Sequence, residues 1–112
     1  MAKPVQLGNG QVWSTQSAAK AYFKRLLHSY TDGQKVIDPS DHSDLLALLV
    51  AYDHGLDVGE RKAGVGVDYF YKDSDDEHGG VTSCFYVHRI DGSFIDFSYI
   101  KAIEHISRRQ AG

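Results

Sequence analysis

The first of three stretches with helical periodicity begins near the N-terminus. Apolar residues recur every three or four positions from Ala19 to Tyr30, which places them on one face of a helix. Ser14 or Thr15 stands just before this stretch and can cap the first turn. The pattern therefore predicts a helix that ends at about Ser29.

The second helical stretch has a distinct start signal. Asp38 precedes Pro39, which combines a capping carboxylate with a proline at the first helical position. Apolar residues then form a stripe from Leu45 to Tyr52, and Gly55 follows it. The pattern predicts a second helix from Asp38 to about Gly55.

Two short apolar segments near the N-terminus flank a turn sequence. Residues 5–7 and 11–13 stand on either side of Gly8-Asn9-Gly10, whose residues tolerate positive φ values. This predicts a short β-hairpin ahead of the first helix.

Three further segments have the composition of strands. Residues 65–72 and 82–90 are rich in Val, Tyr and Phe, which suit a pleated and partly buried surface. Asp91-Gly92 is a two-residue hairpin signal, so residues 93–97 should return antiparallel to the preceding strand.

A last helix completes the pattern. Ser98 can cap it, and Ile100, Ile103 and Ile106 give it an apolar face up to about Arg108. The order is a hairpin, two helices, three strands and a helix, with no linker or internal repeat. This order predicts an α+β fold, a single domain over residues 1–112 in which helices cover an antiparallel sheet.

The composition agrees with this picture and bears on location. The chain has 112 residues, 42% of them hydrophobic and 24% charged, as in an ordinary globular domain. Cys84 is the only cysteine, so no intramolecular disulfide can form and a reducing compartment is favoured. Since no stretch has the length and apolarity of a membrane span or signal peptide, we expect a cytoplasmic protein with no membrane partner.

Charge is distributed unevenly along the chain. The net charge is −3, yet no Lys or Arg occurs between Val36 and Glu60, and a second acidic run spans residues 73–77. Positive charge is concentrated in the other elements. We therefore expect a molecule with an acidic and a basic part.

Cys84 and His88 are the first candidates for a catalytic pair. Four residues along a strand separate them by roughly 13 Å, too far for proton transfer from thiol to imidazole. We expect Cys84 to be a buried core residue instead. The six histidines show no metal-ligand spacing, and no phosphate loop or nucleophile motif occurs. The sequence therefore indicates no enzyme, cofactor or metal.

Basic residues gather on one face of two predicted helices. Lys20 and Lys24 recur at a four-residue spacing and, with Arg25, lie opposite the apolar stripe of the first helix. Lys101 and Arg108 lie on the corresponding face of the last helix. Two ordinary solvated faces are the alternative interpretation.

Four aromatic residues fall on the predicted strands: Tyr69, Tyr71, Tyr86 and Phe94. If they face outward they can stack on unpaired bases, and if they face inward they contribute only to the core. The sequence leaves both possibilities open.

Several motifs resemble those of one family. They are Cys84-Phe85-Tyr86-Val87, Arg89-Ile90-Asp91-Gly92-Ser93 and Asp96-Phe97-Ser98-Tyr99, together with residues 23–30 and 64–67. This set resembles the signature of the DCL (defective chloroplasts and leaves) family. Its members include plant proteins implicated in plastid ribosomal RNA processing and C-terminal domains of the largest subunits of plant RNA polymerases IV and V. The resemblance implies a stand-alone bacterial or phage-type member with a nucleic-acid-linked binding role. Within these motifs, Asp96 can accept hydrogen bonds from Arg89 across the predicted hairpin, as a structural pair or a ligand site.

Two functional hypotheses follow. The first is an RNA- or DNA-binding accessory domain that uses six basic residues: Lys20, Lys24, Arg25, Arg89, Lys101 and Arg108. The second is a protein-interaction module that docks through the acidic second helix and the loop around Asp75. The sequence indicates no oligomeric state.

Overall fold

The computed structural model describes residues 5–74 and 83–111. The elements in chain order are β1 (Val5–Gln6), β2 (Val12–Trp13), α1 (Gln16–His28), α2 (Pro39–Asp53), the short 3-10 helix η1 (Val58–Glu60), β3 (Val67–Ser74), β4 (Ser83–Arg89), β5 (Phe94–Phe97) and α3 (Tyr99–Ala111). They form an α+β domain, which confirms the predicted fold class. The acidic loop around Asp75 lies outside the described residues.

The caps that the sequence predicts are present. The Thr15 hydroxyl accepts a hydrogen bond from the Ala18 N–H at 3.1 Å and so starts α1. The Asp38 carboxylate accepts hydrogen bonds from two first-turn N–H groups of α2, and Pro39 is the first residue of that helix. These local interactions explain why both helices begin where the sequence predicts.

The larger sheet has the antiparallel order β3-β4-β5. Gly92, with a φ of +89°, makes the turn between β4 and β5. The outer edge of β3 has a backbone partner in the loop after α1, because the Lys72 N–H bonds the Gln34 carbonyl at 3.0 Å and the Val36 N–H bonds the Phe70 carbonyl at 2.9 Å. This edge is therefore partly covered.

β3 begins later than the sequence predicts. It starts at Val67 rather than residue 65 because Gly64 and Gly66 have φ values of +53° and +132°, which a strand does not adopt. A register shift between Val67 and Tyr69 follows at once. The strand therefore enters the sheet through an irregular segment.

The core lies between one face of the sheet and the helices. Phe70 pairs with Val87, and Phe85 pairs with Phe97; all four side chains are fully buried. They pack with the apolar faces of all three helices, including the fully buried Phe23 of α1. Phe85 and Phe97 therefore anchor the core.

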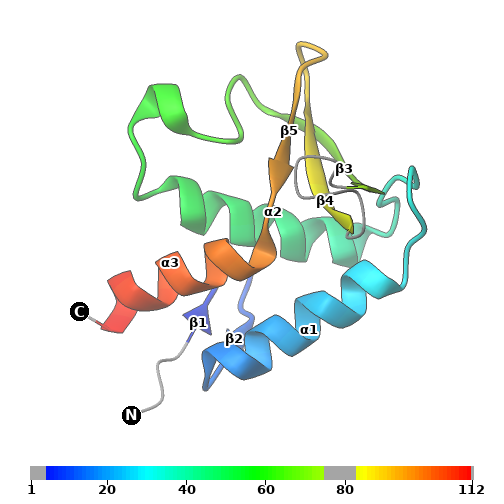
Figure 1. Ribbon diagram of the computed structural model, residues 1–112. Helices are drawn as coiled ribbons and strands as arrows, with labels where there is room; N and C mark the ends of the chain where they lie inside the picture. Colours follow the sequence, from blue (N-terminus) through cyan, green and yellow to red (C-terminus); the bar gives the residue numbers. More distant parts are fainter. Residues whose placement is uncertain (1–4, 75–82, 112) are drawn as a thin grey trace.

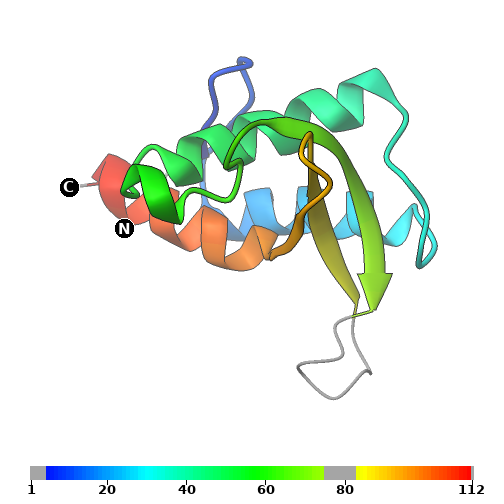
Figure 2. The same ribbon diagram turned by 90° about the horizontal axis from the view of Figure 1, so that it is seen from above.

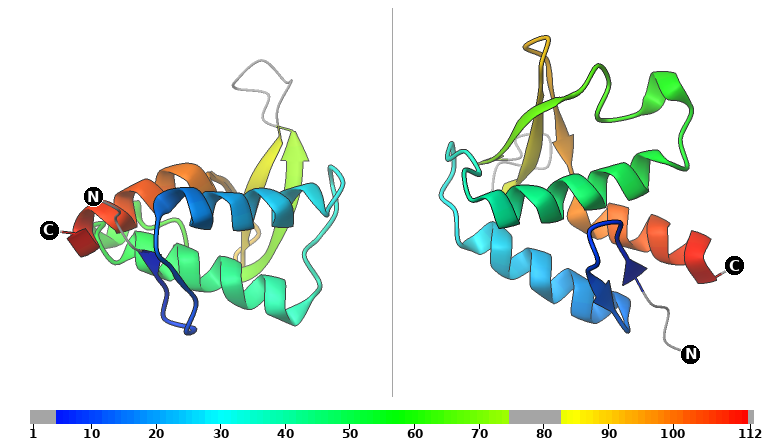
Figure 3. Two further views of the ribbon diagram at one scale, coloured as in Figure 1. Left: turned by 90° about the horizontal axis from the view of Figure 1, so that it is seen from below. Right: turned by 180° about the vertical axis from the view of Figure 1, so that it is seen from behind.

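The figures show how the helices support the sheet. The sheet rises from the layer of helices, and the β4–β5 turn is the part farthest from α1 and α3 (Figure 1). Seen from above, the three helices run along roughly the same direction (Figure 2). The β1–β2 hairpin lies against α1 and α3 (Figure 3). None of the described helices combines the length and apolarity needed to cross a membrane.

Candidate nucleic-acid interface

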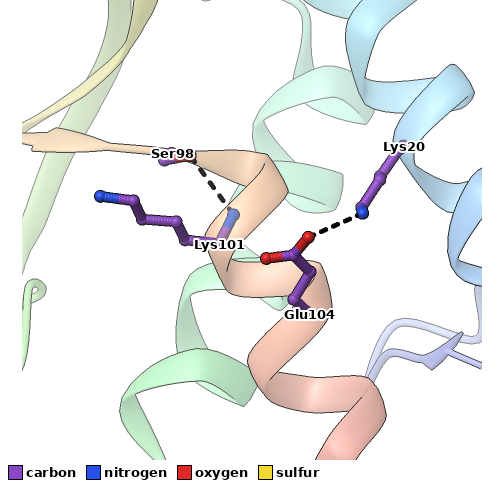
Figure 4. Close-up of polar contacts among 4 residues, drawn as sticks. All are labelled: Lys20, Ser98, Lys101 and Glu104. Atoms are coloured by element: carbon purple, nitrogen blue, oxygen red, sulfur yellow. Dashed lines mark hydrogen bonds and ion pairs between the residues drawn. The ribbon is translucent and has the colours of Figure 1, made fainter.

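The two helices with basic faces are joined by an ion pair. The Lys20 Nζ atom on α1 lies 2.9 Å from the Glu104 Oε2 atom on α3 (Figure 4). The hydrogen bond and charge of Lys20 hold the pKa of Glu104 below its usual value, and the charge of Arg108 adds to this effect. The two basic faces are therefore parts of one surface.

Lys24 extends this surface along α1. It lies one turn after Lys20, and residues four apart share a helix face. Its side chain is exposed, and within residues 5–74 and 83–111 it forms no ion pair. Arg25 is also exposed, but a step of five residues turns it away from Lys20.

Lys101 and Arg108 occupy the exposed face of α3. They are about two turns apart, so they point in the same direction. At the helix start the Ser98 hydroxyl accepts a hydrogen bond from the Lys101 N–H at 3.3 Å, and the Lys101 side chain extends away from Glu104 (Figure 4). We call the following set the helical surface: Lys20, Lys24, Lys101, Glu104 and Arg108.

Arg89 lies apart from the helical surface and is held by the fold. Its side chain is half-buried at the end of β4. The Nε atom donates to the Lys62 carbonyl at 2.8 Å, and Nη1 donates to the Ser93 hydroxyl at 3.3 Å. These bonds join the loop before β3 to the β4–β5 turn, so the geometry favours a structural role.

The expected pair between Arg89 and Asp96 is wrong. Asp96 lies opposite Tyr86 in the sheet, whereas the Arg89 N–H bonds the Ser93 carbonyl at 2.8 Å. Side chains alternate between faces along a strand, so Arg89 and Asp96 point to opposite sides. The hairpin signal located the turn, but the register decided which side chains meet.

Asp44 of α2 is buried rather than presented to a partner, with 5% of its surface exposed. Its carboxylate accepts hydrogen bonds from the Tyr22 hydroxyl, the Asn9 amide at 2.8 Å and the Gln11 amide at 3.2 Å. These contacts attach the N-terminal hairpin and α1 to α2. Sequence reasoning missed this cluster because its members are far apart along the chain.

Two other carboxylates of α2 also have internal partners. Asp41 accepts a hydrogen bond from the Tyr30 hydroxyl at 2.6 Å. Asp53 is buried and accepts hydrogen bonds from the N–H groups of Lys62 and Ala63, both at 2.9 Å. The acidic character of α2 therefore serves its own fold at these positions, which weakens the case for docking through this helix.

The four strand aromatics face away from the core. Ring centroids lie 4.4 Å apart for Tyr69 and His88, 5.2 Å for Tyr71 and Tyr86, and 6.4 Å for Tyr86 and Phe94. Register places these side chains on the face opposite the buried phenylalanines. The structure thus shows that these side chains face outward, a question that the sequence left open.

Charged residues share this aromatic face. The carboxylates of Asp73 and Asp96 lie on it by register, and Asp68 Oδ2 lies 3.3 Å from the Nδ1 atom of His88. The Lys35 ammonium lies 4.2 Å from the ring centroid of Tyr69. We call the following set the outer sheet face: Asp68, Tyr69, Tyr71, Asp73, Tyr86, His88, Phe94 and Asp96.

Cys84 is half-buried, so the expectation of a buried core residue is wrong. It pairs with Asp73 and therefore lies on the aromatic side of the sheet, whereas its neighbour Phe85 points into the core. The apolar surroundings in the sequence concealed this alternation. Among the described residues, no three His, Cys, Asp or Glu side chains are placed to hold a metal ion.

A groove of about 580 Å³ lies between the N-terminal hairpin and α2. Its walls are mainly apolar, with Leu46, Val50 and Ala51 on the helix and Gly8 on the hairpin. His54 is the one titratable group in its lining. The groove offers mainly apolar contact, with Asn9, Ser43 and His54 as polar groups in its lining.

Comparison with solved structures gives one informative match. The solution NMR structure of an uncharacterised protein from Rhodospirillum rubrum is 30% identical in sequence, with a TM-score of 0.73. The match covers 91% of this chain and 89% of that one. A search of curated proteins found no match.

A family profile described as "Protein of unknown function (DUF3223)" matches residues 24–103. The assignment to the DCL family made from sequence motifs is therefore corrected, because neither the family profile nor the similar structure points to it. The motifs that carried the resemblance contain the β4–β5 hairpin and its buried phenylalanines. These residues stabilise the fold.

Proposed function

Because the chain belongs to the DUF3223 family, whose function is unknown, we propose a function from its own surface: the protein binds nucleic acid through phosphate contacts on the helical surface. A cytoplasmic location, where RNA and DNA are both accessible, is part of this proposal.

One observation carries the proposal, namely that the basic faces of α1 and α3 lie side by side on one surface. The chain contains 12 Lys and Arg and 15 Asp and Glu residues. Half of the Lys and Arg residues belong to α1 and α3, but only one of the Asp and Glu residues, Glu104, does. The packing of α1 on α3 brings four of these residues, Lys20, Lys24, Lys101 and Arg108, to one side of a protein that is acidic overall.

The members of the helical surface have different roles in the proposal. Lys24, Lys101 and Arg108 are exposed and can reach phosphate oxygens. Lys20 is held by Glu104, so it contributes mainly to the position of the two helices. Contacts of this kind recognise the backbone and not the bases, so we expect little sequence preference.

The outer sheet face is not part of this proposal. Its rings can in principle stack on bases, but Asp68, Asp73 and Asp96 place negative charge beside them. Phosphates would be repelled there.

The test is a titration of fluorescein-labelled 12-mers of single-stranded RNA, single-stranded DNA and duplex DNA at several salt concentrations. Each phosphate contact to a single strand contributes about −0.7 to the slope of the logarithm of affinity against the logarithm of salt concentration. One contact therefore contributes a factor of about eight in affinity at about 50 mM salt relative to about 1 M salt. We expect Lys24→Glu and Arg108→Glu each to weaken binding by on the order of tenfold and to flatten the slope. All sequences should be affected about equally.

Arg61→Glu is the matched control. Arg61 is exposed in the loop before β3 and lies outside the helical surface, so its reversal changes the net charge equally. If all three variants weaken binding equally, net charge alone acts and the proposed site is wrong. Absence of salt-sensitive binding by the wild-type protein would refute the proposal itself.

A further inference from the structure

The outer sheet face already accommodates one cation of the chain itself. The Lys35 ammonium lies 4.2 Å from the Tyr69 ring centroid, within the range of a cation–π interaction. The ring of Tyr69 also stacks on His88, with 4.4 Å between centroids. This edge of the face therefore shows the chemistry that its rings favour.

The opposite edge of the same face has rings and a carboxylate but no such cation among the described residues. Phe94 on β5 is 63% exposed, and its ring centroid is 6.4 Å from that of Tyr86. Asp96 follows two residues later on the same side of β5 and lies directly opposite Tyr86. An exposed ring and a carboxylate thus stand next to one another.

The Asp96 carboxylate has no hydrogen bond or ion pair in the part of the chain that the structure describes. The nearby Lys62 ammonium bonds the Asp96 main-chain carbonyl at 2.7 Å and not the carboxylate. The three carboxylates on or beside the face, those of Asp68, Asp73 and Asp96, outnumber the two ammonium groups near it, those of Lys35 and Lys62. The charge of the face is complementary to a cation.

We propose that the outer sheet face binds a basic segment of a protein partner, with an arginine guanidinium on the Phe94 ring beside Tyr86 and paired with Asp96. Arginine fits both contacts, because its planar guanidinium stacks on aromatic rings while its N–H groups donate to a carboxylate. Lysine can make the same contacts with a point charge and no bidentate geometry. This interaction is independent of the helical surface.

The probe is a fluorescein-labelled peptide of four Arg-Gly repeats, measured by anisotropy against the intact protein, with four Lys-Gly repeats as comparison. Phe94→Ala and Asp96→Asn should each weaken binding of the arginine peptide about two- to fivefold, the range for exposed cation–π and ion-pair contacts. The double variant should weaken it by roughly tenfold. The arginine peptide should bind more tightly than the lysine peptide.

The two control variants make similar changes at residues outside the outer sheet face. Ile90→Ala removes another exposed apolar side chain near the same turn, and Asp57→Asn removes an exposed carboxylate elsewhere. Both should bind the peptide like the wild type. Asp96→Asn keeps the size of the side chain and Phe94 is exposed, so both test variants should fold.

Two results would overturn the inference. One is peptide binding that is unchanged in both Phe94→Ala and Asp96→Asn. The other is a Phe94→Ala variant that loses affinity for single-stranded RNA but not for the peptide, which would make the face a platform for bases. Lys24→Glu and Arg108→Glu should not weaken peptide binding, so this inference and the nucleic-acid proposal can fail separately.

Discussion

The Tyr22 hydroxyl of α1 donates a hydrogen bond to the buried carboxylate of Asp44 on α2. This contact reverses one expectation from the sequence, in which Asp44 belonged to an acidic surface. We expect Asp44→Ala to lower the free energy of unfolding by about 1–3 kcal/mol, because the Tyr22 hydroxyl and the amides of Asn9 and Gln11 lose their shared acceptor. Urea denaturation measures the change. Asp57→Ala, an exposed carboxylate, should stay within about 0.5 kcal/mol, and equal losses in both variants would contradict the structural role of Asp44.

The same contact predicts sensitivity to alkaline pH. The hydrogen bond to Asp44, followed by burial and the nearby carboxylate charges, raises the pKa of Tyr22 from 10.0 to about 12. Burial and Asp41 raise the pKa of Tyr30 as well. Since the folded pKa lies above the unfolded one, this stabilisation is complete below pH 10 and is lost as the pH rises through about 12.

We therefore expect the free energy of unfolding to fall between about pH 10 and pH 12, measured by urea denaturation at several pH values. Tyr22→Phe should reduce this fall, because the variant lacks one of the hydroxyls whose pKa is raised by the fold. Tyrosine ionisation followed by absorbance should be delayed in the folded protein. A wild-type stability that stays constant through this range would exclude the linkage.

Gly64 and Arg89 should be energetically coupled. A Cβ atom on Gly64 would lie 2.8 Å from the Arg89 Nε atom, which donates to the Lys62 carbonyl. Gly64 also has a φ of +53°, so Gly64→Ala costs about 1 kcal/mol from the backbone alone. We expect a total of about 2 kcal/mol in the wild type and about 1 kcal/mol in an Arg89→Ala background. A double-mutant cycle with no coupling would show that the Arg89 side chain moves aside at no cost.

Glu104→Gln should strengthen nucleic-acid binding. The change removes the only acidic residue of the helical surface and releases Lys20 for phosphate contact. We expect an affinity gain of up to about eightfold at about 50 mM salt and a steeper salt slope. The ion pair is partly exposed, so stability should fall by no more than about 1 kcal/mol. Glu60→Gln, an exposed acid on η1, is the matched control and should leave the affinity nearly unchanged.

Local chemistry explains why the elements were predictable. Thr15 and Asp38 cap their helices with hydrogen bonds to residues two or three positions away, so the information lies within one turn. The Asp91-Gly92 turn likewise needs only the positive φ of Gly92. Predictions that depended on such short-range contacts were confirmed, including the α+β order of elements.

The candidate surfaces depended on longer-range information. The sequence indicated two separate basic helix faces, but their union depends on Lys20 and Glu104, which lie on opposite ends of the chain. The predicted pair of Arg89 and Asp96 was wrong because side chains alternate between the two faces of a strand. A register that differs by one residue therefore places a side chain on the opposite face. Lys35 gave no signal, since its position over Tyr69 arises from a loop that pairs with the edge of β3.

The sequence by itself determined the helices, the turns and most of the apolar residues that form the core, because capping, φ preferences and periodicity act between near neighbours. Only the tertiary structure decided that Asp44 is buried, that the aromatic rings of β3 and β4 share a face with carboxylates, and that α1 and α3 join their charges. These features arise when packing brings distant residues together, and a buried group must then find its hydrogen-bond partners wherever the fold places them.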